Sequence, residues 1–142
     1  MMKTSLLTPT TTDRCIPLFG ATVRAGFPSP ADDFVERPLD IHNYLVKHPA
    51  ATFFARAEGD SMTGFGIFSG DLLVVDRALQ PQHGDVVIAA IDGELTCKVL
   101  DLNEQLLRAG NLRYPPIELH DNAELIIEGV VVHSVRHHRC LR

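Results

Sequence analysis

The sequence predicts a mostly β protein: a compact antiparallel β domain with one short helix, preceded by a flexible N-terminal arm. Two β-rich runs flank Asp92-Gly93, a pair typical of the type I′ turn of a hairpin. Several other short apolar runs lie between residues 51 and 135, whereas the first 38 residues have no helical or strand periodicity. At 142 residues the chain suits a single domain. We therefore expect an arm over residues 1–38 and a β-rich domain over residues 39–142.

The arm is rich in threonine and poor in apolar periodicity. Residues 4–17 hold five Thr, one Ser and two Pro, so little apolar area offsets the entropy cost of ordering. Phe27-Pro28-Ser29-Pro30 continues the arm in extended form, because each proline disfavours helical geometry in the residue before it. We expect a mobile segment without a helix-turn-helix.

The domain begins with the helix and continues with strands. Asp40 can cap a helix whose apolar positions recur at Ile41, Tyr44 and Leu45, and which ends before Pro49. The strands expected after it cover residues 51–57, 72–75, 85–91, 94–100, 106–107, 117–119 and 125–135.

Charge and composition exclude several classes of protein. The formal net charge is −5, whereas a dedicated nucleic-acid binder usually has a basic domain, so we expect no direct specific DNA binding. No apolar run approaches the roughly 18 residues that span a bilayer, so we expect a cytoplasmic protein without a membrane anchor. Three cysteines without a C-x-x-C pair form no disulfide or zinc framework. We expect no cofactor.

One serine is placed where it could act as a nucleophile. Ser61 follows a predicted strand in Glu58-Gly59-Asp60-Ser61-Met62 and precedes a glycine-bearing stretch. A serine at such a bend can project its hydroxyl, and the backbone N–H groups of Ser61 and Met62 could serve as oxyanion donors. The alternative is a loop serine that caps a turn.

One lysine lies inside a predicted hairpin strand. Strand alternation places Lys98 on one face with Thr96 and Leu100, and Cys97 on the opposite, core-facing side. Burial disfavours the ammonium, and a neutral lysine can take the proton of a serine hydroxyl. The alternative is an edge-strand lysine that prevents aggregation.

The order and spacing of several motifs resemble the LexA/UmuD-type self-cleaving serine peptidases of the SOS response. The resemblance covers the chain from about Leu18 to Val135. The matching motifs are Phe27-Pro28-Ser29-Pro30, Gly59-Asp60-Ser61-Met62, Gly70-Asp71-Leu72-Leu73-Val74-Val75-Asp76, His83-Gly84-Asp85-Val86-Val87-Ile88-Ala89-Ala90, and Asp92-Gly93-Glu94-Leu95-Thr96 with Lys98.

The resemblance implies a fold, an activity and partners. The fold is that of the LexA C-terminal and signal-peptidase-like type, with Ser61 as nucleophile and Lys98 as general base. The matching cleavage bond is Ala25–Gly26, just ahead of Phe27. The resemblance further implies a homodimer, cleavage stimulated by the RecA filament on single-stranded DNA, and a processed form that serves a UmuC-type Y-family polymerase in lesion bypass.

Other interpretations remain open. A LexA-type repressor needs an N-terminal DNA-binding domain where this chain has its Thr-rich arm, and a signal peptidase needs a membrane anchor. The main rival is a noncatalytic polymerase-binding subunit with a vestigial dyad. The tail residues His133, His137, His138 and Cys140 could bind a metal, although a solvated tail is the simpler interpretation. Two further alternatives are a Ser61-His83-acid triad and a cation at Asp32-Asp33; we favour a turn at His83 and an exposed acidic pair.

Overall fold

The computed structural model describes residues 14–20, 23, 25–26, 37–120 and 124–139. The chain forms two compact units, residues 1–47 and residues 48–142. Each unit is described by itself. The predicted boundary between residues 38 and 39 stays a prediction.

The first unit contains a strand pair and the helix. Strand β1 (Cys15–Leu18) pairs antiparallel with β2 (Arg37–Asp40), with Cys15 opposite Asp40. The sequence did not predict this pair, because the two strands are distant in the chain and Ile16 and Leu18 stay exposed in it, which leaves no buried-face pattern. Backbone pairing orders residues 15–17, which we had assigned to the mobile arm. The Phe27–Pro30 segment lies outside the described residues.

The predicted helix is confirmed and is shorter than expected. Helix α2 (Ile41–Leu45) starts after Asp40, whose carboxylate accepts from the backbone N–H groups of His42 and Asn43 at 3.1 and 3.3 Å. The helix ends at Leu45, and Val46 is already extended.

The second unit is a seven-stranded sheet with the order β3-β4-β9-β5-β6-β7-β8, and every adjacent pair is antiparallel. The mostly β prediction is therefore confirmed. The strands are β3 (Thr52–Arg56), β4 (Leu72–Asp76), β5 (Val86–Ile91), β6 (Glu94–Asp101), β7 (Leu106–Arg108), β8 (Ile117–Glu118) and β9 (Leu125–Val135), with one-turn 3-10 helices η2 (Pro49–Ala51) and η3 (Thr63–Phe65).

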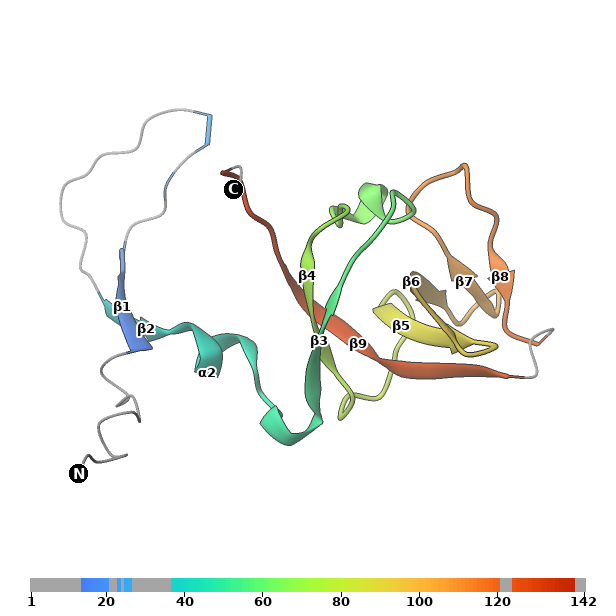
Figure 1. Ribbon diagram of the computed structural model, residues 1–142, viewed down its shortest axis with the longest axis horizontal. Helices are drawn as coiled ribbons and strands as arrows, with labels where there is room; N and C mark the ends of the chain where they lie inside the picture. The colour runs from blue at the N-terminus through green and yellow to red at the C-terminus, as the bar shows by residue number, and fades with distance from the viewer. Residues whose placement is uncertain (1–13, 21–22, 24, 27–36, 121–123, 140–142) are drawn as a thin grey trace, which may run out of the picture. The chain divides into compact units, whose positions relative to one another are not determined.

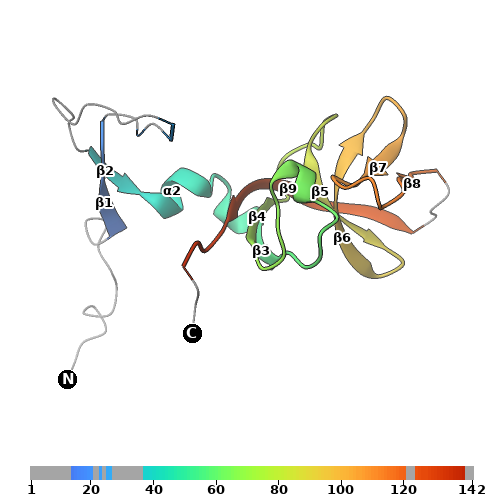
Figure 2. The same cartoon turned by 90° about the horizontal axis from the view of Figure 1, so that it is seen from above.

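The long strand β9 joins the two halves of the sheet (Figure 1). Its C-terminal half pairs with β4 and its N-terminal half pairs with β5. The register shifts once in each pairing, between Val74 and Val75 of β4 and between Ile88 and Ala89 of β5. Figure 2 shows β7 and β8 at the end of this unit farther from β3 and β4. The shifts bend the sheet, since a bulge increases the local twist.

The core consists of two apolar clusters. The first contains Met62, Ile67, Leu73, Val75, Ile88 and Val99, and the second contains Val87, Ala89, Leu100, Leu107 and Val130. Strand β6 contributes Val99 to one cluster and Leu100 to the other, as alternation along a strand requires.

The hairpin between β5 and β6 has the predicted turn. Asp92 and Gly93 have φ values of 51° and 83°, the positive pair that a type I′ turn demands. The turn sets a register in which Val87 lies opposite Lys98 and Ile88 lies opposite Cys97. The hairpin thereby fixes the position of Lys98 along the sheet.

Candidate active site

Ser61 lies at a pocket of about 300 Å³ in the second unit. The pocket is lined by residues of β3, β5, β6 and the loop between β3 and β4: Ala55, Arg56, Glu58, Ser61, Ile88, Leu95, Thr96 and Cys97. We call the segment from Glu58 to Gly66 the nucleophile loop. A pocket walled by strand edges can accept an extended peptide beside the serine.

Burial of Met62 anchors the nucleophile loop. Met62 is 3% exposed and belongs to the first core cluster, against which Phe53 and Cys97 also pack. Gly59 adopts φ 89°, a left-handed conformation that favours glycine, and its N–H donates to Ser69 Oγ at 3.2 Å. Ser61 is therefore held at the pocket by the side chain that follows it.

The structure brings Lys98 to Ser61. Lys98 Nζ lies 3.3 Å from Ser61 Oγ, 3.0 Å from Thr96 Oγ1 and 3.2 Å from the carbonyl oxygen of Cys97. The lysine is 7% exposed. Its burial, predicted from strand alternation, is confirmed. In the described residues, strand β7 pairs with β6 only at Val99, Leu100 and Asp101, so it is this burial that argues against a solvent-facing lysine at a sheet edge.

Burial lowers the pKa of the Lys98 ammonium, because the low-dielectric surroundings disfavour the charged form. No carboxylate contributes to this shift. A neutral amine at 3.3 Å from a hydroxyl is within reach of its proton once the two groups align. The pair has the geometry and electrostatics of a base beside a nucleophile.

The backbone N–H groups of Ser61 and Met62 are available as donors. In the part of the chain that the structure describes, neither donates to a backbone acceptor, whereas Thr63, Gly64 and Phe65 all do. Free N–H groups beside a nucleophile can stabilise an oxyanion. The sequence named these two groups as candidates, and their role stays a prediction.

A second loop contacts the nucleophile loop, and no local sequence pattern indicated this contact. The Gly110 N–H donates to the Ser61 carbonyl at 2.6 Å, and the Gly64 N–H donates to the Gly110 carbonyl at 2.8 Å. Asn111 Nδ2 donates to the Asp60 carbonyl at 3.2 Å, and the Tyr114 hydroxyl donates to Asp60 Oδ1 at 2.6 Å. The Tyr114 bond lowers the pKa of the Asp60 carboxyl. These contacts join residues about fifty positions apart, beyond the reach of local pattern.

An ion pair between an exposed arginine and a buried aspartate holds the end of the same region. Arg136, just after β9, forms a bidentate pair with Asp71 at 3.0 and 2.8 Å and donates to the Gly66 carbonyl at 2.5 Å. Its guanidinium also lies over the Phe68 ring, 4.0 Å from the centroid. The hydrogen bond from Arg136 lowers the pKa of Asp71 despite the burial of that carboxylate. The sequence analysis did not identify this pair.

The other candidate residues belong to other elements of the chain. Ala25 and Gly26 belong to the first unit, where both are exposed. His83 lies in a turn, as we favoured. Its Nδ1 accepts from the backbone N–H of Leu102 at 3.1 Å and lies 3.6 Å from Asp101 Oδ1. That contact directs the ring toward the end of β6, so the triad alternative has no support.

The remaining alternatives concern metals and thiols. Among the residues that the structure describes, no group of three His, Cys, Asp or Glu side chains could hold a metal ion. Cys140, Asp32 and Asp33 lie outside those residues. Burial raises the pKa of the Cys97 thiol to about 11, consistent with its predicted place in the core.

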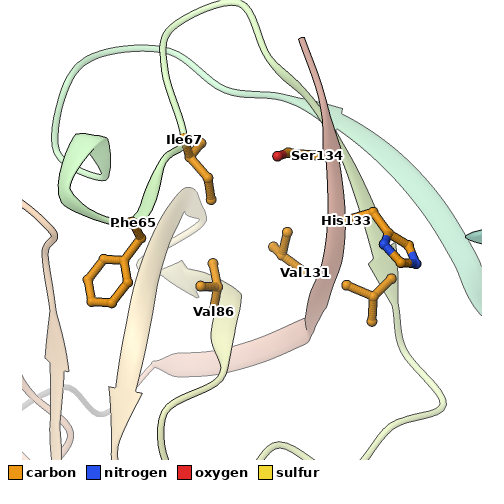
Figure 3. A pocket seen from close by; sticks show the side chains of 7 residues that line it. Phe65, Ile67, Val86, Val131, His133 and Ser134 are labelled. Carbon is orange, nitrogen blue, oxygen red and sulfur yellow. The ribbon is translucent and has the colours of Figure 1, made fainter. Parts of the chain in front are cut away.

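A second pocket lies beside η3 and β9. It has a volume of about 210 Å³ and is lined by Phe65, Ile67, Val86, Val131, Val132, His133 and Ser134. Figure 3 shows Ile67, Val86 and Val131 pointing toward a common space. This pocket contains no group placed to act on Ser61.

The sequence matches the peptidase S24-like family over residues 17–132. The chain belongs to this family. It is therefore a serine peptidase of the self-cleaving LexA/UmuD type. No helix in the described part of the chain is long and apolar enough to cross a membrane.

Individual relatives place the chain within the family. It is 48% identical to the ImpA protein of Escherichia coli over 89% of this chain and 87% of ImpA, and 43% identical to the MucA protein of Escherichia coli over 89% of each. It is 38% identical to the LexA repressor of Shewanella halifaxensis over 87% of this chain and 61% of the repressor. The chain is a UmuD-like homologue of the proteins of SOS mutagenesis.

Proposed function

We propose that this peptidase cleaves its own chain between Ala25 and Gly26 with a Ser61–Lys98 dyad. The observation that carries the proposal is the 3.3 Å contact between Ser61 Oγ and the buried Lys98 Nζ. The exposed Ala25–Gly26 bond fits the role of substrate, because small side chains let the backbone approach a nucleophile closely.

The reaction follows the Ser-Lys variant of acyl transfer. Ser61 Oγ attacks the Ala25 carbonyl carbon while neutral Lys98 takes the hydroxyl proton. The N–H groups of Ser61 and Met62 stabilise the negative charge on the former carbonyl oxygen. Lys98 then returns the proton to the Gly26 nitrogen as the peptide bond breaks, which leaves Ala25 as an ester on Ser61. Water, deprotonated by Lys98, hydrolyses this ester.

Regulation and partners belong to the same proposal. The similarity to ImpA, MucA and the LexA repressor supports cytoplasmic cleavage that is stimulated by the RecA filament on single-stranded DNA. The cleaved form then acts as a homodimeric accessory subunit of a UmuC-type Y-family translesion polymerase. The protein itself makes no sequence-specific contact with DNA.

A noncatalytic subunit with a vestigial dyad is the competing function, and incubation at alkaline pH separates the two. The wild type should cleave itself, because more Lys98 is then neutral, and Ser61→Ala and Lys98→Ala should each abolish cleavage. Ser134→Ala on β9 is the matched control and should cleave like the wild type, since Ser134 lies away from the Ser61 pocket. An uncleaved wild-type protein would support the noncatalytic subunit.

A further inference from the structure

Two neighbouring carbonyls of the nucleophile loop are held by one loop of the second unit. The Asp60 carbonyl accepts from Asn111 Nδ2 at 3.2 Å, and the Ser61 carbonyl accepts from the Gly110 N–H at 2.6 Å. We call residues 109–114 the anchoring loop. None of its residues lines the Ser61 pocket.

The anchored carbonyls determine where two N–H groups point. The Asp60 carbonyl belongs to the same peptide unit as the Ser61 N–H, and the Ser61 carbonyl to the same unit as the Met62 N–H. A trans peptide is planar, with its C=O and N–H directed to opposite sides, and no peptide bond in the described residues is cis. Both N–H groups therefore point away from the anchoring loop.

The side chain of Asn111 is itself fixed. Its Oδ1 accepts from the Arg113 N–H at 3.0 Å, and its backbone carbonyl accepts from the Tyr114 N–H at 3.1 Å. Tyr114 in turn donates to the Asp60 carboxylate at 2.6 Å. Within the nucleophile loop, the Asp60 carbonyl also accepts from the Thr63 N–H at 3.4 Å and from the Thr63 hydroxyl at 3.2 Å. The amide of Asn111, bonded at both its oxygen and its nitrogen, adds the contact that ties the Asp60–Ser61 peptide unit to the anchoring loop.

We propose that Asn111 is a positioning residue, which aims the Ser61 N–H at the oxyanion of the self-cleavage reaction. It acts with the Gly110 N–H, which orients the Met62 N–H in the same way. This inference rests on the proposed self-cleavage. Asn111 contributes orientation, and its hydrogen bonds in the described residues go to the nucleophile loop and to its own loop.

Asn111→Asp tests the role by replacing the donating amide nitrogen with an oxygen, which also introduces a negative charge. The aspartate retains an oxygen for the Arg113 N–H but has no N–H to donate to the Asp60 carbonyl. Leu112→Ala is the matched control in the same loop, because the Leu112 side chain is fully exposed. The measurement is the first-order rate of self-cleavage of the full-length protein between pH 7 and pH 11, with the folded fraction followed by circular dichroism.

We expect Asn111→Asp to lower the plateau rate about 10- to 100-fold, less than the loss of an entire oxyanion donor. The pH midpoint should stay where it is in the wild type, because Lys98 is untouched, and Leu112→Ala should match the wild type. Three results would overturn the role of Asn111 and leave the dyad standing. The first is a plateau rate for Asn111→Asp within twofold of the wild type, and the second is a shifted pH midpoint with an unchanged plateau rate. The third is a loss of cleavage rate no larger than the unfolded fraction explains. A wild type that does not cleave would overturn the proposed function, and this inference with it.

Discussion

At the scale of single residues, Lys98 is the one basic side chain among the buried charged residues of the described chain. Its Nζ has three oxygen acceptors, on Ser61, Thr96 and Cys97, yet the side chain is 7% exposed. The acceptors stabilise the ammonium, whereas desolvation opposes it and is the larger effect. The net effect is a lowered pKa, which is the direction that a lysine acting as a base requires.

The lowered pKa of Lys98 sets the direction of the pH dependence. Only the neutral amine accepts the Ser61 proton, so the self-cleavage rate should rise about tenfold per pH unit below this pKa. The rate should level off before pH reaches the ordinary lysine value, about 10.4. The measurement is the first-order rate from gel densitometry over that pH range.

Thr96→Val should move this rate profile to lower pH. Valine has the shape of threonine but accepts no hydrogen bond, so the ammonium of Lys98 loses the acceptor at 3.0 Å and its pKa falls further. Thr52→Val on β3 is the control, because the Thr52 hydroxyl donates to the His48 carbonyl instead. An unchanged or upward-shifted profile for Thr96→Val would mean that Thr96 does not stabilise the charged lysine.

Sequence reasoning identified the two dyad candidates and missed the residues that hold the surrounding loops, for a physical reason. Ser61 and Lys98 stand in local motifs, and the burial of Lys98 follows from strand alternation. Asn111 contacts Asp60 across fifty-one positions of the chain, and Arg136 contacts Asp71 across sixty-five. Such pairs depend on how the loops meet in the fold, which no local pattern of a single sequence encodes.

At the scale of elements, the strands with apolar alternation or turn signals were predicted within about two residues. Strand β9 matches its predicted range, and the β5–β6 hairpin matches in both strands and turn. The β1–β2 pair was not predicted, because its strands bury little and are separated by about twenty residues. Strand prediction depends on a buried face, and these strands have none.

The contact between the nucleophile loop and the anchoring loop depends on two glycines. A Cβ on Gly64 would lie 2.1 Å from the Gly110 carbonyl oxygen, so Gly64→Ala must separate the loops. We expect it to lower the free energy of unfolding by about 1–3 kcal/mol, typical of overpacking, and to slow self-cleavage. Urea denaturation and the cleavage rate measure the two effects.

Gly93→Asn is the control for Gly64→Ala. Gly93 has a positive φ that asparagine tolerates, and a Cβ there meets nothing within 4 Å. This variant should keep its urea midpoint and its cleavage rate. If Gly64→Ala also kept the wild-type urea midpoint and cleavage rate, the position of Ser61 would not depend on close packing of the two loops.

At the scale of the whole molecule, the proposed substrate and the proposed dyad belong to different units of one chain. Ala25 and Gly26 lie in residues 1–47, and Ser61 and Lys98 lie in residues 48–142. Covalent attachment raises the effective concentration of the bond at the dyad, so no external substrate is needed. Within the first unit, β1 and β2 pair with each other, with Cys15 opposite Asp40.

The most direct test of this account is intact mass spectrometry of the full-length protein after incubation with RecA, ATP and single-stranded DNA. Cleavage at Ala25–Gly26 removes 25 residues and leaves a product of 142 − 25 = 117 residues that begins at Gly26. We predict this product for the wild type, and only the uncut chain for Ser61→Ala and Lys98→Ala. A wild-type protein that stays intact, or the same product from either variant, would contradict the account.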